Sequence, residues 1–131
     1  MVDIAPYESK LVSLDEVPSD TRRGGDVRTL LSPKTVGSHW GFMGAARIEP
    51  GDSIAEHYHP YSEEFVFLFE GSLIARIDGE RKVLPSGSAI FIPILAKHKF
   101  INESDTDAFM VFHLCPLAPR PPMGHVDTET K

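Results

Sequence analysis

The sequence predicts an all-β fold of the sandwich or barrel class, in one domain of 131 residues. Short runs rich in Val, Ile and Phe recur along the chain, and turn residues separate them about every 8–12 residues. No long segment has helical periodicity. The predicted strands number nine, at 27–31, 39–49, 54–59, 63–70, 72–77, 80–84, 88–92, 97–102 and 107–114.

The two ends of the chain lie outside this series of strands. Residues 1–26 are expected to form an N-terminal arm, with at most one helical turn, at 14–18. The strongest hairpin signal is Asp78-Gly79, which separates two of the predicted strands. Residues 116–131 are rich in proline and are expected to form a tail that lies extended on the surface.

Alternation of side chains predicts which residues form the core. Between residues 39 and 49, Trp40 and Phe42 share one parity and Arg47 has the other. The parity of Arg47 should face water, because a lone buried arginine is costly. The expected core residues are Trp40, Phe42, Val66, Leu68, Ile77, Phe91 and Phe100.

Composition excludes several classes of protein. The net charge is -6 and no basic run is present, which argues against nucleic acid or an anionic membrane as a partner. The single cysteine, Cys115, cannot form an internal disulfide. No apolar run approaches the roughly 20 residues of a membrane span, and the N-terminus lacks a signal-peptide pattern. These features predict a cytoplasmic protein.

The segment from Gly51 to Gly71 contains the residues with the clearest chemistry. His57 and His59 are two apart on a predicted strand, so both imidazoles should project from one face. Glu64 opens the next strand after a turn, where its carboxylate can lie beside them. Imidazole is the commonest ligand of transition metals, so the arrangement predicts a metal site.

A second segment adds a further candidate ligand, His98. The flanking residues Lys97 and Lys99 should face water, which turns His98 inward together with Phe100. An isolated inward histidine is more often a core residue than a ligand. The presence of the first segment favours the ligand interpretation.

At these residues the chain resembles the cupin superfamily. The first cupin motif, G-x5-H-x-H-x4-E-x6-G, is matched by Gly51, His57, His59, Glu64 and Gly71. The second motif, G-x5-P-x-G-x2-H-x3-N, is matched by Gly87, Pro93, His98 and Asn102. The sequence departs from this motif at Leu95, where glycine is usual. The resemblance implies a conical jelly-roll barrel of two sheets. It also implies a metal held by His57, His59, Glu64 and His98.

Three stretches further resemble the small cupin cyclases of aromatic (type II) polyketide pathways, and most closely the resistomycin-type cyclases. They are residues 22–37, 56–65 and 116–127. The resemblance implies a hydrophobic polyketide substrate, with association with other components of a polyketide synthase as a further expectation.

The sequence allows more than one role for His113 and more than one direction for the phenylalanines of the strand at 63–70. The strand ending near His113 should lie beside the strand of Glu64, so His113 is either a further metal ligand, a partner of a ligand, or a core residue. Phe65, Phe67 and Phe69 have the parity opposite to Glu64. If Glu64 faces inward, these rings face outward, and residues 1–31 or a second subunit of a homodimer should cover them. If the rings line the cavity, Glu63 faces the metal instead.

The function implied by the resemblance is metal-dependent cyclisation of a poly-β-ketone chain by an intramolecular aldol reaction followed by aromatisation. A divalent metal would act as a Lewis acid, with Glu64, His113 or a metal-bound hydroxide as the base. Zn²⁺ is the expected metal because cyclisation needs no redox chemistry, although the ligands also suit Fe, Ni, Mn or Cu. Two alternatives are an Fe-dependent cupin oxygenase and a small-molecule-binding cupin whose metal is structural.

Overall fold

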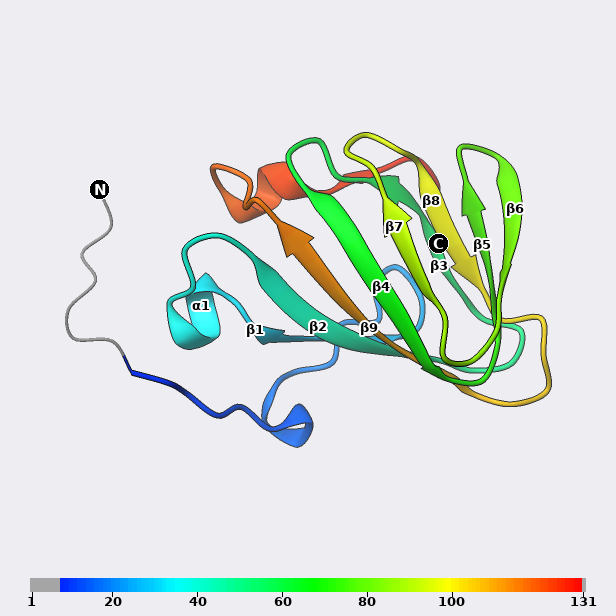
Figure 1. Ribbon diagram of the computed structural model, residues 1–131, viewed down its shortest axis with the longest axis horizontal. Helices are drawn as coiled ribbons and strands as arrows, with labels where there is room; N and C mark the ends of the chain where they lie inside the picture. Colours follow the sequence, from blue (N-terminus) through cyan, green and yellow to red (C-terminus); the bar gives the residue numbers. More distant parts are fainter. Residues whose placement is uncertain (1–7, 131) are drawn as a thin grey trace.

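Two facing antiparallel sheets of five strands each form the barrel (Figure 1). The computed structural model describes residues 8–130. Within that range the strands are β1 (Asp26–Leu31), β2 (Phe42–Ile48), β3 (Ser53–Tyr58), β4 (Glu63–Glu70), β5 (Leu73–Ile77), β6 (Glu80–Leu84), β7 (Ala89–Ile92), β8 (His98–Ile101), β9 (Ala108–Cys115) and β10 (Val126–Asp127). The predicted all-β fold is confirmed, and each of the nine predicted runs contains a strand.

The strand order explains how the barrel closes. One sheet has the order β1-β2-β9-β4-β7 and the other has the order β10-β3-β8-β5-β6, so strands close in sequence alternate between the sheets as in a jelly roll. The helical segments among the described residues are single turns: η1 (Leu14–Glu16), α1 (Pro33–Val36) and η2 (Pro121–Gly124). No helix in this part of the chain is long and apolar enough to cross a membrane.

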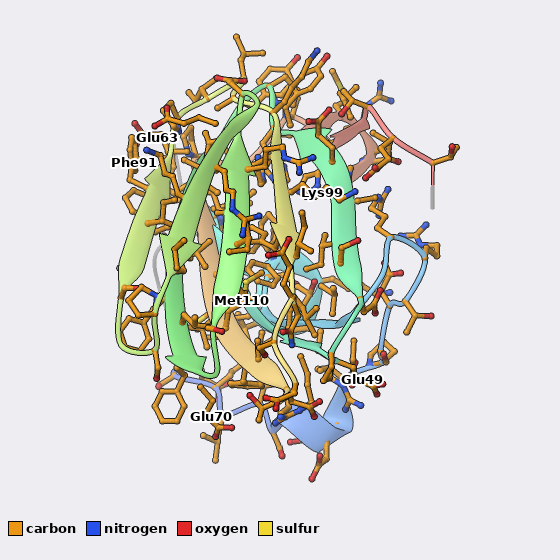
Figure 2. The ribbon with its side chains drawn as sticks, turned by 90° about the vertical axis from the view of Figure 1, so that its right-hand side faces the viewer. Glu49, Glu63, Glu70, Phe91, Lys99 and Met110 are labelled. Atoms are coloured by element: carbon orange, nitrogen blue, oxygen red, sulfur yellow. The ribbon has the colours of Figure 1, made fainter. Side chains whose placement is uncertain are left out.

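The core lies between the two sheets and follows the alternation of the strands. On β4, Val66 and Leu68 are buried. Met110 on β9 also lies between the sheets, whereas Phe91 lies at the outer edge (Figure 2). The prediction of a core position is therefore wrong for two residues. Phe91 is 49% exposed because β7 turns it to the outer face, and Trp40 is 69% exposed because it precedes β2.

The outer face of the β4 sheet carries a group of exposed aromatic rings. Phe65, Phe67 and Phe69 are 44%, 39% and 61% exposed, and Phe91 lies opposite Phe65 across β4 and β7. The outward direction of these rings is confirmed. The described part of residues 1–31 does not cover them, so that alternative is wrong for residues 8–31. Cover by a second subunit stays a prediction that sedimentation velocity can check.

The end of the N-terminal arm packs against the barrel. Val17 is buried, and the backbone amide of Ala55 donates to the carbonyl oxygen of Arg23 at 2.8 Å. The amide of Gly25 donates to Asp52 Oδ2 at 2.9 Å. Residues 23–25 are therefore fixed beside β3, which places the Arg23 side chain near the interior.

The C-terminal tail departs from the prediction of a uniformly extended surface segment. Residues 121–124 form the turn η2, and β10 pairs with β3, with Val126 opposite Tyr58 and Asp127 opposite His57. In Figure 1 this segment, in red, runs from the end of β9 toward β3. Edge pairing with β3 supplies backbone hydrogen bonds that proline counting could not reveal. The tail thereby lies next to the histidine segment.

Leu95, at the glycine position of the second motif, adopts the left-handed conformation with φ 73°. Its amide donates to the carbonyl oxygen of His59 at 3.0 Å. The turn geometry that glycine would supply is therefore present, at the energetic cost of a side chain in the left-handed region.

Asn102 links two loops at the end of the barrel away from the histidines. The side chain is fully buried. Its Nδ2 donates to the carbonyl oxygens of Ile48 and Thr106, both at 2.8 Å, and its Oδ1 accepts from the Ser104 amide at 2.9 Å. Replacement by alanine would remove all three bonds and leave the buried Ile48 carbonyl without this donor.

We therefore expect Asn102→Ala to lower the free energy of unfolding by about 2–4 kcal/mol. Urea denaturation measures this change. The neighbouring control is Glu103→Ala, which removes an exposed ion pair with Arg81 and should lower the free energy of unfolding much less than Asn102→Ala. Equal effects of the two substitutions would contradict the assigned role of Asn102.

Candidate metal centre

Antiparallel pairing of β3 with β8 brings two of the predicted histidines together. His57 and His98 are direct cross-strand partners, and their ring centroids lie 4.3 Å apart. His59 follows two residues after His57, and its ring centroid lies 4.9 Å from that of His57. All three rings are buried, with at most 8% of each residue exposed. One sheet thus supplies three imidazoles to one space.

An irregularity in β3 lets both apolar and histidine side chains face the cavity. The register with β8 shifts between Ile54 and His57. Residues three apart on a regular strand point to opposite faces, yet Ile54 and His57 both line the same cavity. A bulge of this kind redirects side chains and is frequent beside functional sites. Ala55, within this irregular stretch, provides the carbonyl oxygen that accepts from His57 Nδ1.

Glu64 enters the same space from the opposite sheet. Its Oε1 lies 2.9 Å from His98 Nε2 and 3.2 Å from His59 Nε2, and the residue is only 5% exposed. One ligand atom from each of His57, His59, Glu64 and His98 lies within 4.8 Å of the others. The structure therefore brings together the four residues of the predicted ligand set, and Glu64, not Glu63, is the inward acid.

Each histidine is oriented by a backbone carbonyl. The Nδ1 atoms of His57 and His98 donate to the carbonyl oxygens two residues earlier, Ala55 and Ala96, at 2.8 and 2.9 Å. His59 Nδ1 donates to the carbonyl oxygen of Gly124 in the tail, at 2.8 Å. Because a carbonyl oxygen can only accept, the proton of each neutral ring is on Nδ1. The Nε2 atoms are then lone-pair donors, which is the tautomer a metal needs.

The buried polar atoms of this cluster also fit a cation. Glu64 Oε1 and His98 Nε2 are buried, and neither has a properly directed hydrogen bond although they lie 2.9 Å apart. A carboxylate oxygen and an imidazole lone pair repel each other at this distance unless a positive charge lies between them. Three imidazole nitrogens and one carboxylate oxygen suit a first-row divalent ion. The residues present therefore fit the metal that the cupin motifs imply.

Burial and mutual contact shift the protonation of the cluster. Burial lowers the pKa of His57 to about 3, and His98 and His125 contribute to the shift. Burial alone would raise the pKa of Glu64, but the imidazoles of His59 and His98 outweigh it and lower that pKa. Burial likewise opposes a charged His98, yet Glu64 raises its pKa above the ordinary value. Without metal, a proton shared with Glu64 supplies the positive charge.

The contribution of His57, Glu64 and His98 to the stability of the metal-free protein should therefore be greatest near pH 6.5. Unfolded His57 binds a proton near pH 6.5, whereas folded His57 stays neutral down to about pH 3, so stability falls as the pH falls through this window. Ionised Glu64 adds to the loss below its ordinary pKa of 4.5. The contribution of His98 has the opposite sign, because its raised pKa gives stability that is lost as the pH rises through that value.

Thermal unfolding of chelator-treated protein between pH 4.5 and pH 8 measures this dependence. His57→Asn should flatten the acid side, because the group that must stay neutral is gone. Stability that continues to rise from pH 6.5 down to pH 4.5 would contradict the prediction.

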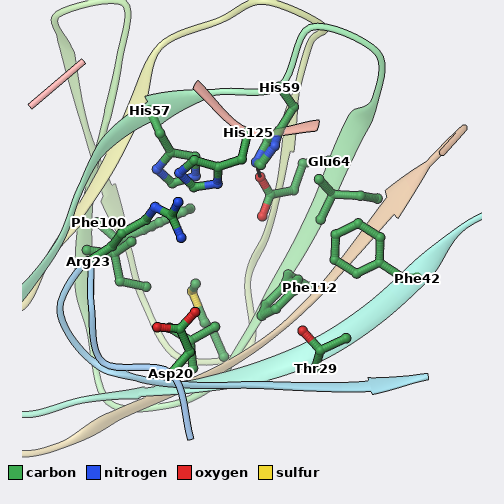
Figure 3. A pocket seen from close by; sticks show the side chains of 14 residues that line it. Asp20, Arg23, Thr29, Phe42, His57, His59, Glu64, Phe100, Phe112 and His125 are labelled. Atoms are coloured by element: carbon green, nitrogen blue, oxygen red, sulfur yellow. Dashed lines mark ion pairs between the residues drawn. The ribbon is translucent and has the colours of Figure 1, made fainter. Parts of the chain in front are cut away.

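The cluster forms part of the wall of a cavity of about 200 Å³ between the sheets (Figure 3). Most of the remaining wall is apolar and is made of Val27, Phe42, Ile54, Phe100, Met110, Phe112 and Leu114. Polar side chains from the N-terminal arm and β1 complete it, and Figure 3 shows Asp20 and Thr29 across the cavity from the histidines. The cavity can hold an apolar ligand against a charged, metal-ligating end.

Sequence reasoning missed three residues beside the cluster. The ring of His125, expected on the surface, stacks on His57 with centroids 4.2 Å apart and planes inclined by 11°. Its Nε2 donates to Asp127 Oδ1 at 2.9 Å, and Arg23 Nε donates to the same oxygen at 2.8 Å. The stretches 22–37 and 116–127, which resemble the polyketide cupins, contain all three residues. The resemblance therefore included these residues but did not indicate that they contact one another.

His113 lies outside the cluster, and the expectation that it binds the metal or acts as base is wrong. β9 does run beside β4 as predicted, with Leu114 opposite Glu64. Leu114 therefore faces the interior, and its neighbour His113 lies exposed on the outer face against Phe65, with ring centroids 5.9 Å apart. The parity of β9 could not be derived from the sequence because residues on both faces are apolar.

A double-sheet jelly roll with two histidines from one strand, a third from its partner strand and an acid from the facing sheet defines a cupin. The family model for the cupin domain matches residues 44–114, and the chain belongs to this family. A solved oxalate oxidase shares the fold, with a TM-score of 0.77 at 20% identity over 97% of this chain and 68% of that chain.

The relatives in sequence confirm the predicted resemblance to polyketide cupins. The chain is 53% identical over 120 residues to polyketide synthase CurC of Streptomyces cyaneus, covering 92% of this chain and 78% of the relative. It is 42% identical over 118 residues to the tetracenomycin polyketide synthase protein TcmJ of Streptomyces glaucescens, covering 90% and 79%. The polyketide cyclase RemF of Streptomyces resistomycificus shares the fold, with a TM-score of 0.73 at 19% identity over 95% of this chain and 88% of that chain.

Proposed function

We propose that the protein is a metal-dependent polyketide cyclase that promotes intramolecular aldol cyclisation and aromatisation of a poly-β-ketone intermediate. The observation that carries the proposal is the buried cluster of His57, His59, Glu64 and His98 in the wall of an apolar cavity. Its relatives CurC and TcmJ are named polyketide synthase proteins, which supports the substrate class.

His57, His59 and His98 would hold the ion through Nε2, with Glu64 as the fourth ligand. We favour Zn²⁺, since ring closure by an aldol reaction transfers no electrons to a metal, and the same donors also accept Fe, Ni, Mn or Cu. When bound, the ion would supply Lewis-acid polarisation of a substrate carbonyl, which acidifies the adjacent C–H bonds.

The chain itself supplies position, proton transfer and exclusion of water. Phe42, Phe100 and Phe112 are among the walls that would hold the flexible chain in one fold, so that the attacking carbon and the accepting carbonyl meet. Glu64, kept ionised by His59 and His98, can accept the C–H proton where it is not tightly bound to the ion. The carbon then bonds to the second carbonyl, and loss of water forms the aromatic ring.

The cavity size suggests which part of the substrate enters. A volume of about 200 Å³ is below the range of about 300–1,000 Å³ that holds a complete drug-sized ligand. The reacting segment of the chain would therefore occupy the cavity while the rest extends outside. We place this reaction in the cytoplasm, in association with the other components of a polyketide synthase.

The test is a reconstituted mixture that generates the linear poly-β-ketone chain, supplied with the metal-loaded protein or with chelated protein. We expect the cyclised aromatic product only with the loaded protein. Spontaneous products in equal yield from both mixtures would overturn the proposal. Oxygen consumption that requires Fe and accompanies product formation would instead identify an oxygenase. Metal uptake without any turnover would identify a binding cupin.

A further inference from the structure

The C-terminal segment contacts two of the three histidines of the candidate metal centre. The carbonyl oxygen of Gly124 accepts the Nδ1 proton of His59 at 2.8 Å. The next residue, His125, stacks on the ring of His57. The corresponding carbonyl partners of His57 and His98 lie only two residues from the histidines that they orient. His59 alone depends on a partner from a distant part of the chain.

Asp127 fixes the position of His125. Its Oδ1 accepts hydrogen bonds from His125 Nε2 at 2.9 Å and from Arg23 Nε at 2.8 Å. Because Nε2 of His125 is turned to Asp127, His125 stands beside the ligand cluster without belonging to it. We call these three residues the Arg23–Asp127–His125 chain. It connects the N-terminal arm with the C-terminal segment next to His57.

The arm is itself attached to the bulge that orients His57. The carbonyl oxygen of Arg23 accepts from the amide of Ala55, and the carbonyl oxygen of Ala55 accepts from His57 Nδ1 at 2.8 Å. Figure 3 shows the Arg23 guanidinium beside the stacked rings of His57 and His125. Arg23 is therefore linked to the metal centre by two series of hydrogen bonds, one through Ala55 and one through Asp127.

We propose that the Arg23–Asp127–His125 chain positions His57 and His59 for metal binding, with His125 and Asp127 as positioning residues that do not bind the ion. Asp127 holds the ring of His125 against His57. It also keeps β10 in register, which holds the Gly124 carbonyl at His59 Nδ1. The inference rests on the metal centre of the proposed function. It adds residues of the N-terminal arm and of the C-terminal segment to that centre. Partners of metal-ligating histidines typically contribute about 10–100-fold in affinity.

The experiment measures Co²⁺ binding by the full-length protein, in competition with a chromogenic chelator, and records the visible spectrum of the bound ion. Asp127→Ala is expected to weaken Co²⁺ binding about 10–100-fold and to change the absorption bands, since the histidine orientations change. His125→Ala should have a similar effect. His125→Phe keeps a ring against His57 and should retain more affinity than His125→Ala.

The matched control lies next to Asp127 in the same segment. Thr128→Val removes the hydrogen bond from Thr128 Oγ1 to Glu56 Oε1, and its backbone bond to Glu56 is unaffected. We expect its Co²⁺ affinity to stay within about twofold of the wild type. The double variant Asp127→Ala/His125→Ala should bind about as well as either single variant, because the two residues act together.

The outcomes separate this inference from the proposed function. If the wild type takes up no Co²⁺, the metal centre is wrong and the inference fails with it. If the wild type binds Co²⁺ and both Asp127→Ala and His125→Ala match its affinity and spectrum, the inference alone is overturned. An equal loss in Thr128→Val would show that general attachment of the tail matters instead, which also overturns it. Circular dichroism confirms that each variant is folded.

Discussion

His98→Ala is expected to abolish high-affinity metal binding and to lower the rate of ring closure by about 1,000-fold or more. His98 is fully buried, its Nε2 lies 2.9 Å from Glu64 Oε1, and Ala96 fixes its orientation. Alanine removes one of the three imidazoles that would hold the ion. Lewis-acid polarisation contributes several kcal/mol, and each 1.4 kcal/mol is about tenfold in rate.

Isothermal titration with Zn²⁺ and product analysis in the reconstituted mixture check both parts. The control is His113→Ala, which changes a histidine on the exposed outer face and should leave binding and turnover unchanged. Normal ring closure by His98→Ala would contradict the proposed metal centre. A loss of turnover in His113→Ala equal to that in His98→Ala would show that the assignment of the site to the cavity is wrong.

Removing the metal from the wild type is expected to stop ring closure reversibly and to lower the melting temperature by about 10 °C relative to protein with excess ion. At a free ion concentration of 100 times Kd, binding adds about 2.7 kcal/mol to the free energy of unfolding. For a domain of this size that corresponds to a shift of about 10 °C. Thermal melts with and without chelator, and product yield after readdition of the ion, are the measurements.

Readdition of different ions separates the proposed cyclase from the alternative oxygenase. Zn²⁺ and Co²⁺ should both restore ring closure, without oxygen. Recovery with Fe²⁺ alone, coupled to oxygen consumption, would contradict cyclisation as the main reaction. Full turnover by the metal-free protein would contradict the proposal that ring closure depends on a metal.

Much of the fold and of the ligand set could be predicted because local patterns determine them. Two histidines two residues apart must share a face of a strand, and the turn after them returns the chain with Glu64 at its start. The parity argument that placed His98 inward between two lysines also holds, since His98 and Phe100 are both buried. These relations depend on neighbours in the sequence and on strand alternation alone.

The remaining features depend on contacts between distant parts of the chain. The register of β3 with β8 shifts between Ile54 and His57, and β10 pairs with the edge of β3, which offers unpaired backbone groups to the tail. Asp127 and Arg23 are separated by 104 residues, so no local pattern links them. Both faces of β9 are apolar, which left the direction of His113 undetermined until its register with β4 was known.

The most direct test is a crystal structure of the Zn²⁺-loaded protein, with the ligands of the ion identified. We predict one ion bound by Nε2 of His57, His59 and His98 and by Glu64, with at least one further position taken by water. Nδ1 of each histidine should still donate to its backbone carbonyl. An ion bound elsewhere, ligation through Nδ1, or an empty space among the three histidines at saturating Zn²⁺ would contradict the account.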